Sequence, residues 1–130
     1  ITYFKSLFFK NFVKEESWNN AEKQAFVLAQ NLLGKDIKYD EIPWFWTNQF
    51  NSNYQILGDI SRFDNYVERI YSEEKITYFY IRYNKIVGML AINNGRDVSI
   101  MRKVLKNTND VNLEIIKNVN MDLKKLIRND

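Results

Sequence analysis

The spacing of apolar side chains gives the clearest helical signal between residues 19 and 33. Apolar residues there recur at the intervals of one helix face, at Ala21, Ala25, Leu28, Ala29 and Leu32. Asn19 is the expected N-cap, because Glu22 follows it at capping-box spacing. Gly34 stands where a left-handed residue commonly ends a helix. The pattern therefore predicts one helix from Asn19 to Leu33.

Strand-like runs fill the middle of the sequence. The candidate strands are Tyr54–Ile60, Tyr66–Tyr71, Ile76–Arg82 and Ile86–Ile92. The last two flank a short polar turn at residues 83–85, so we expect them to pair as an antiparallel hairpin. Residues 73–75 are charged and are expected to form a solvated turn.

The remaining segments are expected to surround this sheet. Ile1–Lys14 has no helical period and predicts an extended or irregular arm. Asp97 is expected to cap a second helix that runs to about Lys106, with Val98, Met101 and Leu105 on one face. Thr108–Asp130 predicts a short helix and a covering segment. The fold class is α+β, with an antiparallel sheet and flanking helices.

Composition excludes several classes of function. The chain has no Cys and no His, which excludes disulfides, a cysteine nucleophile and the commonest general base and metal ligand. We therefore expect neither a metal site nor catalytic side chains. No apolar run approaches the length of a membrane span or a signal peptide, so a cytoplasmic protein without a membrane partner is expected. The net charge of +3 suits an acidic partner.

Three blocks of sequence together resemble one enzyme family. Residues 16–21 (Glu-Ser-Trp-Asn-Asn-Ala) are followed by residues 43–49 (Pro-Trp-Phe-Trp-Thr-Asn-Gln), and Asn94, Arg96 and Asp97 then follow a hydrophobic strand. In this order they are similar to the C-terminal portion of FAD-dependent NAD(P)H:ferredoxin or rubredoxin reductases. The tryptophan block is the most specific of the three. Thr47 and Asn48 stand where the family usually has Ser and Asp.

The resemblance implies a division of labour along the chain. Residues 1–40 would be the end of an FAD-binding domain, including its last helix, and residues 41–130 the reductase C-terminal α+β domain. Ser17, Trp18, Asn20 and Trp44 would contact FAD, and Trp44 and Trp46 would bind a ferredoxin or rubredoxin-type electron carrier. NAD(P)H would be the electron donor of the complete enzyme. Phe45, between the tryptophans, is expected to point into the core.

The nucleotide-binding loops of such an enzyme are missing from this sequence. Its four glycines are Gly34, Gly58, Gly88 and Gly95, and none has the spacing of a dinucleotide fingerprint. We therefore expect this chain to be inactive alone and to purify without colour. A non-enzymatic module that binds a redox partner or dimerises stays an alternative. Nucleic-acid binding through basic and aromatic residues is disfavoured, because cross-strand packing explains them as well; the residues concerned are Tyr78, Tyr80, Arg82 and Tyr83.

Overall fold

The computed structural model describes residues 3–6, 8–107 and 112–127. The chain divides into two compact units, residues 1–45 and residues 46–130. The boundary expected between residues 40 and 41 falls in the connector that follows the first helix. Each unit is described here by itself.

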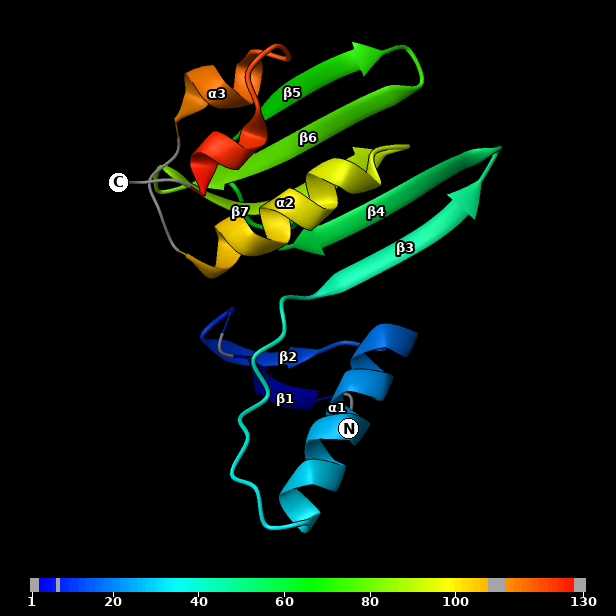
Figure 1. Ribbon diagram of the computed structural model, residues 1–130, viewed down its shortest axis with the longest axis vertical. Helices are drawn as coiled ribbons and strands as arrows, with labels where there is room; N and C mark the ends of the chain where they lie inside the picture. The colour runs from blue at the N-terminus through cyan, green and yellow to red at the C-terminus, as the bar shows by residue number, and fades with distance from the viewer. Residues whose placement is uncertain (1–2, 7, 108–111, 128–130) are drawn as a thin grey trace. The chain divides into compact units, whose positions relative to one another are not determined.

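The first unit is a β-hairpin followed by one helix (Figure 1). Strands β1 (Tyr3–Ser6) and β2 (Asn11–Lys14) pair antiparallel, and helix α1 spans Trp18–Leu32. The segment expected to be an extended or irregular arm is thus a hairpin. Its strands are stabilised by the stacked rings of Tyr3 and Phe12, whose centroids lie 5.5 Å apart.

Helix α1 begins and ends one residue earlier than expected, and its N-cap lies two residues earlier. The N-cap is Ser17 rather than Asn19, because the Ser17 hydroxyl accepts a hydrogen bond from the Asn20 amide at 3.1 Å. Asn19 lies inside the first turn. Gly34 follows the C-cap with a φ of 89°, which confirms its expected left-handed conformation.

The second unit is a five-stranded antiparallel sheet covered by helices (Figure 1), and its first strand begins two residues before the boundary, at Trp44. Its strands are β3 (Trp44–Gln49), β4 (Ser52–Gly58), β5 (Asn65–Ser72), β6 (Lys75–Arg82) and β7 (Lys85–Ile92), in the order β3-β4-β7-β6-β5. The expected β6–β7 hairpin is confirmed. Both residues of its turn, Tyr83 and Asn84, have positive φ, as a tight two-residue hairpin turn requires.

The core lies between this sheet and its helices. Leu57, Met89, Phe79 and Val67 face one another in register across four strands, and all four are buried. Helix α2 (Gly95–Lys106) packs on β4 and β7, and α3 (Leu113–Lys117) packs on β5. The 3₁₀ helix η1 (Leu123–Leu126) contacts both of these helices. The α+β fold is confirmed.

The second helix begins earlier than expected. Asn94 occupies the N-cap position, and the side chain of Asp97 lies within the first turn without capping it. The expected apolar face of Val98, Met101 and Leu105 is buried. The tail contains the short helix α3 and then η1, while residues 108–111 and 128–130 of the expected tail lie outside the described residues.

Candidate functional site

Three of the expected flavin-contacting residues meet at the start of α1. The Ser17 hydroxyl donates to a carboxylate oxygen of Glu15 at 2.9 Å while it caps the helix. The Asn20 side chain is buried, donates to the Glu15 carbonyl at 2.7 Å, and accepts from Gln24 and Tyr39. Ser17 and Asn20 therefore build the helix start, and Trp18, 76% exposed, is the large side chain displayed there.

Burial shifts two acidic groups beside this helix start. Burial raises the pKa of the Glu15 carboxyl, although the hydrogen bond from Ser17 opposes this shift. Burial, with the nearby carboxylates of Glu15 and Glu41, raises the pKa of Tyr39 to about 12. Tyr39 therefore stays protonated at neutral pH, as the hydrogen bond that it donates to the side-chain oxygen Oδ1 of Asn20 at 2.8 Å requires.

The helix start can stabilise negative charge. The first N–H groups of any helix have no acceptor within the helix, and that end carries roughly half a positive charge. In α1 the Ser17 hydroxyl accepts the hydrogen bond of the Asn20 amide. The first backbone hydrogen bond of the helix runs from the Ala21 amide to the Ser17 carbonyl. An anionic ring edge placed beside Trp18 would meet both the positive helix end and an exposed aromatic face.

The remaining expected site residues lie on β3. Trp44 is partly buried, and Trp46 is 49% exposed. Alternation along the strand places Trp44 and Trp46 on one side and Phe45 on the other. The expectation that Phe45 lies in the core is wrong, because it is 50% exposed. β3 is an edge strand, so its side chains have a neighbouring strand on one side only.

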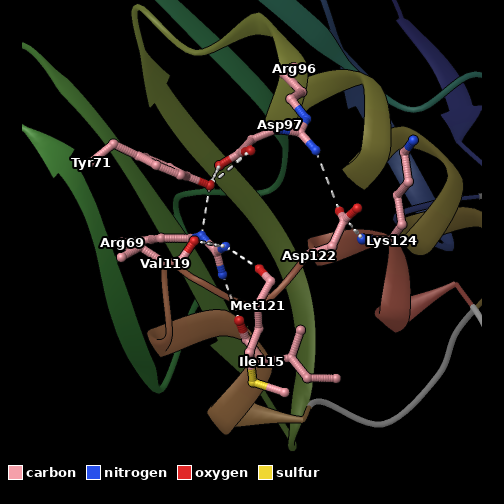
Figure 2. Close-up of polar contacts among 9 residues, drawn as sticks. All are labelled: Arg69, Tyr71, Arg96, Asp97, Ile115, Val119, Met121, Asp122 and Lys124. Carbon is pink, nitrogen blue, oxygen red and sulfur yellow. Dashed lines mark hydrogen bonds and ion pairs between the residues drawn. The ribbon is translucent and has the colours of Figure 1, made fainter.

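A buried polar network joins β5, β6 and α2 in the second unit, and Figure 2 shows the part between Tyr71 and Asp97. The Asp97 carboxylate accepts hydrogen bonds from the Tyr71 hydroxyl at 2.9 Å and from the Thr77 hydroxyl at 2.9 Å. Asn94 donates to the Thr77 oxygen at 3.0 Å. Burial and the bond to Asp97 raise the pKa of the Tyr71 hydroxyl, so it remains a donor. These bonds fix the start of α2 on the sheet.

A basic hollow lies beside this network. It has a volume of about 500 Å³ and is lined by Arg96, Ser99, Ile100, Lys103, Lys124 and Ile127. Its walls are α2 and η1, which bring three cationic side chains together from distant parts of the sequence. The spacing of residues along the sequence could not reveal this surface, because helix α3 separates Lys124 from the cations of α2. The hollow suits an acidic protein surface.

Tyr78 and Tyr80, considered above for nucleic-acid binding, both pack against Tyr66 of β5. Tyr66 lies 6.3 Å from Tyr78 and 6.4 Å from Tyr80, measured between ring centroids, and Phe63 lies 4.8 Å from Tyr80. These are the cross-strand contacts that the pairing of β5 with β6 dictates.

Among the described residues, no helix combines the length and apolar character needed to cross a bilayer.

Comparison with known proteins agrees with this architecture. The reductase C-terminal family matches residues 44–127. A curated relative from Photorhabdus laumondii, the ferredoxin–NAD(+) reductase component of 3-phenylpropionate/cinnamic acid dioxygenase, is 32% identical over 94 residues. That match covers 72% of this chain and 24% of the relative.

Solved structures share the fold. A ferredoxin reductase from Rhodopseudomonas palustris superposes with a TM-score of 0.88 at 32% identity, covering 96% of this chain and 31% of that protein. Putidaredoxin reductase in its covalent complex with putidaredoxin gives a TM-score of 0.88 at 22% identity, covering 96% of this chain and 30% of that chain. This chain therefore spans only about a quarter to a third of its relatives' length. From its sequence and its fold, the chain belongs to the reductase C-terminal family.

Proposed function

We propose that this chain is the C-terminal part of a flavin-dependent reductase that passes electrons from NAD(P)H through FAD to a ferredoxin or rubredoxin-type protein. The family match and the 32% identity to two ferredoxin reductases support this role. The cytoplasm is its proposed location. The observation that carries the proposal is the exposure of Trp46 on an edge strand of a domain with this fold.

The start of α1 suits one edge of a flavin. FAD would supply the electron-accepting and electron-donating chemistry, and the protein would supply position and electrostatics. Trp18 would lie against the ring system, while Ser17 and Asn20 hold the helix start that faces its negative edge. Trp44, on the side of β3 shared with Trp46, would complete the contact.

The second unit would receive the electron carrier. Trp46 offers a large aromatic surface that buries area with little loss of rotamer freedom and excludes water. The basic hollow of Arg96, Lys103 and Lys124 offers charge complementarity to an acidic carrier. Aromatic contact and charge would thus act together, with the charge governing the encounter rate and the tryptophan the lifetime of the complex.

Trp46→Ala in the complete reductase that contains this chain tests the proposal. Loss of a central aromatic contact costs about 2 kcal/mol or more, so affinity for the protein acceptor should fall roughly thirtyfold. Reduction of a small artificial acceptor should change by less than about twofold, because such a molecule needs no docking surface. Steady-state rates with both acceptors give the comparison.

Phe45→Ala is the matched control, because Phe45 is an equally exposed aromatic side chain on the opposite side of the same strand. Its affinity for the protein acceptor should stay within about threefold of the wild type, as for a residue outside the centre of the interface. Equal slowing of both acceptors by Trp46→Ala would show that the tryptophan supports the fold and not the docking surface.

A further inference from the structure

Arg69 is a buried cation with an unusual set of partners. It lies on β5 and faces the helix-covered side of the sheet, in register with Thr77 and next to the core row. A guanidinium has five N–H donors in a rigid fork. Burying it is costly unless those donors find acceptors.

All of the guanidinium nitrogens have acceptors in this structure (Figure 2). Nε donates to the Tyr71 hydroxyl at 2.7 Å. The other two nitrogens donate to four backbone carbonyls of the tail, namely those of Ile115 (2.6 Å), Ile116 (3.1 Å), Val119 (3.2 Å) and Met121 (2.5 Å). One side chain thus connects the sheet to α3 and to the turn between α3 and η1.

The same side chain reaches the start of α2 through Tyr71. The Tyr71 hydroxyl accepts from Arg69 and donates to Asp97, so it bridges a buried cation and a buried carboxylate. Arg96, the residue before Asp97 in α2, lines the basic hollow. On the other side, the clamped tail continues into Asp122, whose carboxylate caps η1 and lies 3.7 Å from Arg96.

We propose that Arg69 is a positioning residue for the basic hollow. By holding the tail directly and the start of α2 through Tyr71, it sets the two walls that carry Lys124 and Arg96. This inference rests on the proposed docking function and assigns the geometry of that surface to a residue that does not line the hollow. Arg69 contacts neither cofactor nor partner in this account.

Two substitutions in the full chain separate geometry from charge. Arg69→Met removes the fork and the charge but keeps an apolar stem, and Arg69→Lys keeps the charge with at most three donors from one point. Both should raise amide hydrogen exchange in residues 113–127 on the order of a hundredfold, because the carbonyl bonds are lost. Exchange in the β6–β7 hairpin should stay within about threefold of wild type.

Binding of an octaglutamate peptide at low ionic strength gives the functional readout. Both Arg69 variants should bind the peptide about fivefold more weakly, and their affinity should depend less on salt. The reason is that Arg96 and Lys124 would no longer lie together at the hollow. If Arg69 contributed only its charge, Arg69→Lys would restore both binding and tail protection. That restoration would overturn the proposal, as would wild-type exchange in the tail of either variant.

Tyr71→Phe tests the link between Arg69 and the start of α2 even if both Arg69 variants fail to fold. It should raise exchange about tenfold in the amides of residues 99–102, which bond to the carbonyls of the first turn of α2, and leave the tail protected, since Arg69 keeps its carbonyl bonds. Tyr66→Phe, on the same strand but on the opposite face, is the control. Unchanged exchange at α2 in Tyr71→Phe would refute the bridge.

The two readouts also separate this inference from the proposed function. Hydrogen exchange needs no partner and tests the clamp alone. A wild-type chain that fails to bind the peptide would contradict the docking surface, and the exchange comparison would then decide the clamp by itself. Faster tail exchange with unchanged peptide binding would overturn the positioning role.

Discussion

The two longer helices of this protein bury very different parts of themselves. α1 has 15 residues, of which one, Asn20, is buried. α2 has 12 residues, of which six are buried. Both helices show helical periodicity in their apolar residues, and α2 lies against β4 and β7, which cover its apolar face.

We expect this difference in burial to make the second unit stable by itself and the first unit dependent on further packing. Residues 46–130 contain a row of buried apolar side chains across four strands and helices that cover it. Residues 1–45 leave Phe26, Leu28 and Leu32 of α1 exposed. Apolar area of that size stabilises a fold only when it is removed from water. Burial of these side chains against a further surface is therefore expected to stabilise the first unit.

The largest expected effect compares two phenylalanines. Phe79→Ala, at a fully buried position of β6, should lower the free energy of unfolding by about 3–5 kcal/mol. Phe26→Ala on α1, where the ring is 61% exposed, should change it by less than about 0.5 kcal/mol. Urea unfolding of both variants measures the difference. Equal destabilisation would mean that α1 packs within a core of its own.

The buried polar network should give an intermediate effect. Asp97→Ala leaves the Tyr71 and Thr77 hydroxyls without their acceptor, at a cost of about 1–3 kcal/mol in unfolding free energy. Asp36→Ala, at an exposed position of the connector, is the matched control and should lie within about 0.5 kcal/mol of wild type. If the two variants unfold at the same urea concentration, the network contributes no stability.

The smallest effect is a pH dependence confined to the first unit. The pKa of Tyr39 is raised from 10.0 to about 12, so its contribution is complete below pH 10 and is lost as the pH rises through 12. Because the ring is partly in water, we expect about 1 kcal/mol. Helix content followed by circular dichroism should fall in that window and not in Tyr39→Phe. A transition of the same size in both chains would assign it to another group.

Alternation and turn chemistry predicted the sheet well. The β6–β7 hairpin follows from two apolar runs around a two-residue turn. The same logic failed at Phe45, because a strand at the edge of a sheet can leave both faces half exposed, and the sequence of β3 does not show that it is an edge.

The polar sites were harder to predict because their partners are distant in sequence. Arg69 contacts carbonyls about fifty positions away, and no local pattern encodes backbone acceptors. A signal was present: Arg69 and Thr77 each lie two strand positions from a buried apolar side chain, Val67 and Phe79 respectively. Polar residues on a core-facing row require partners. The helix cap was likewise assigned to Asn19, because Ser17 and Asn19 are both good caps and only the backbone decides between them.

Native-state hydrogen exchange of the whole chain tests the central contrast most directly. We expect the amides of β6 and β7 to exchange only through global unfolding, and those of α1 at least about a hundredfold faster through local opening. That result would show that the second unit is stable by itself and that the first depends on further packing. Protection of α1 equal to that of the β6–β7 hairpin would contradict the account.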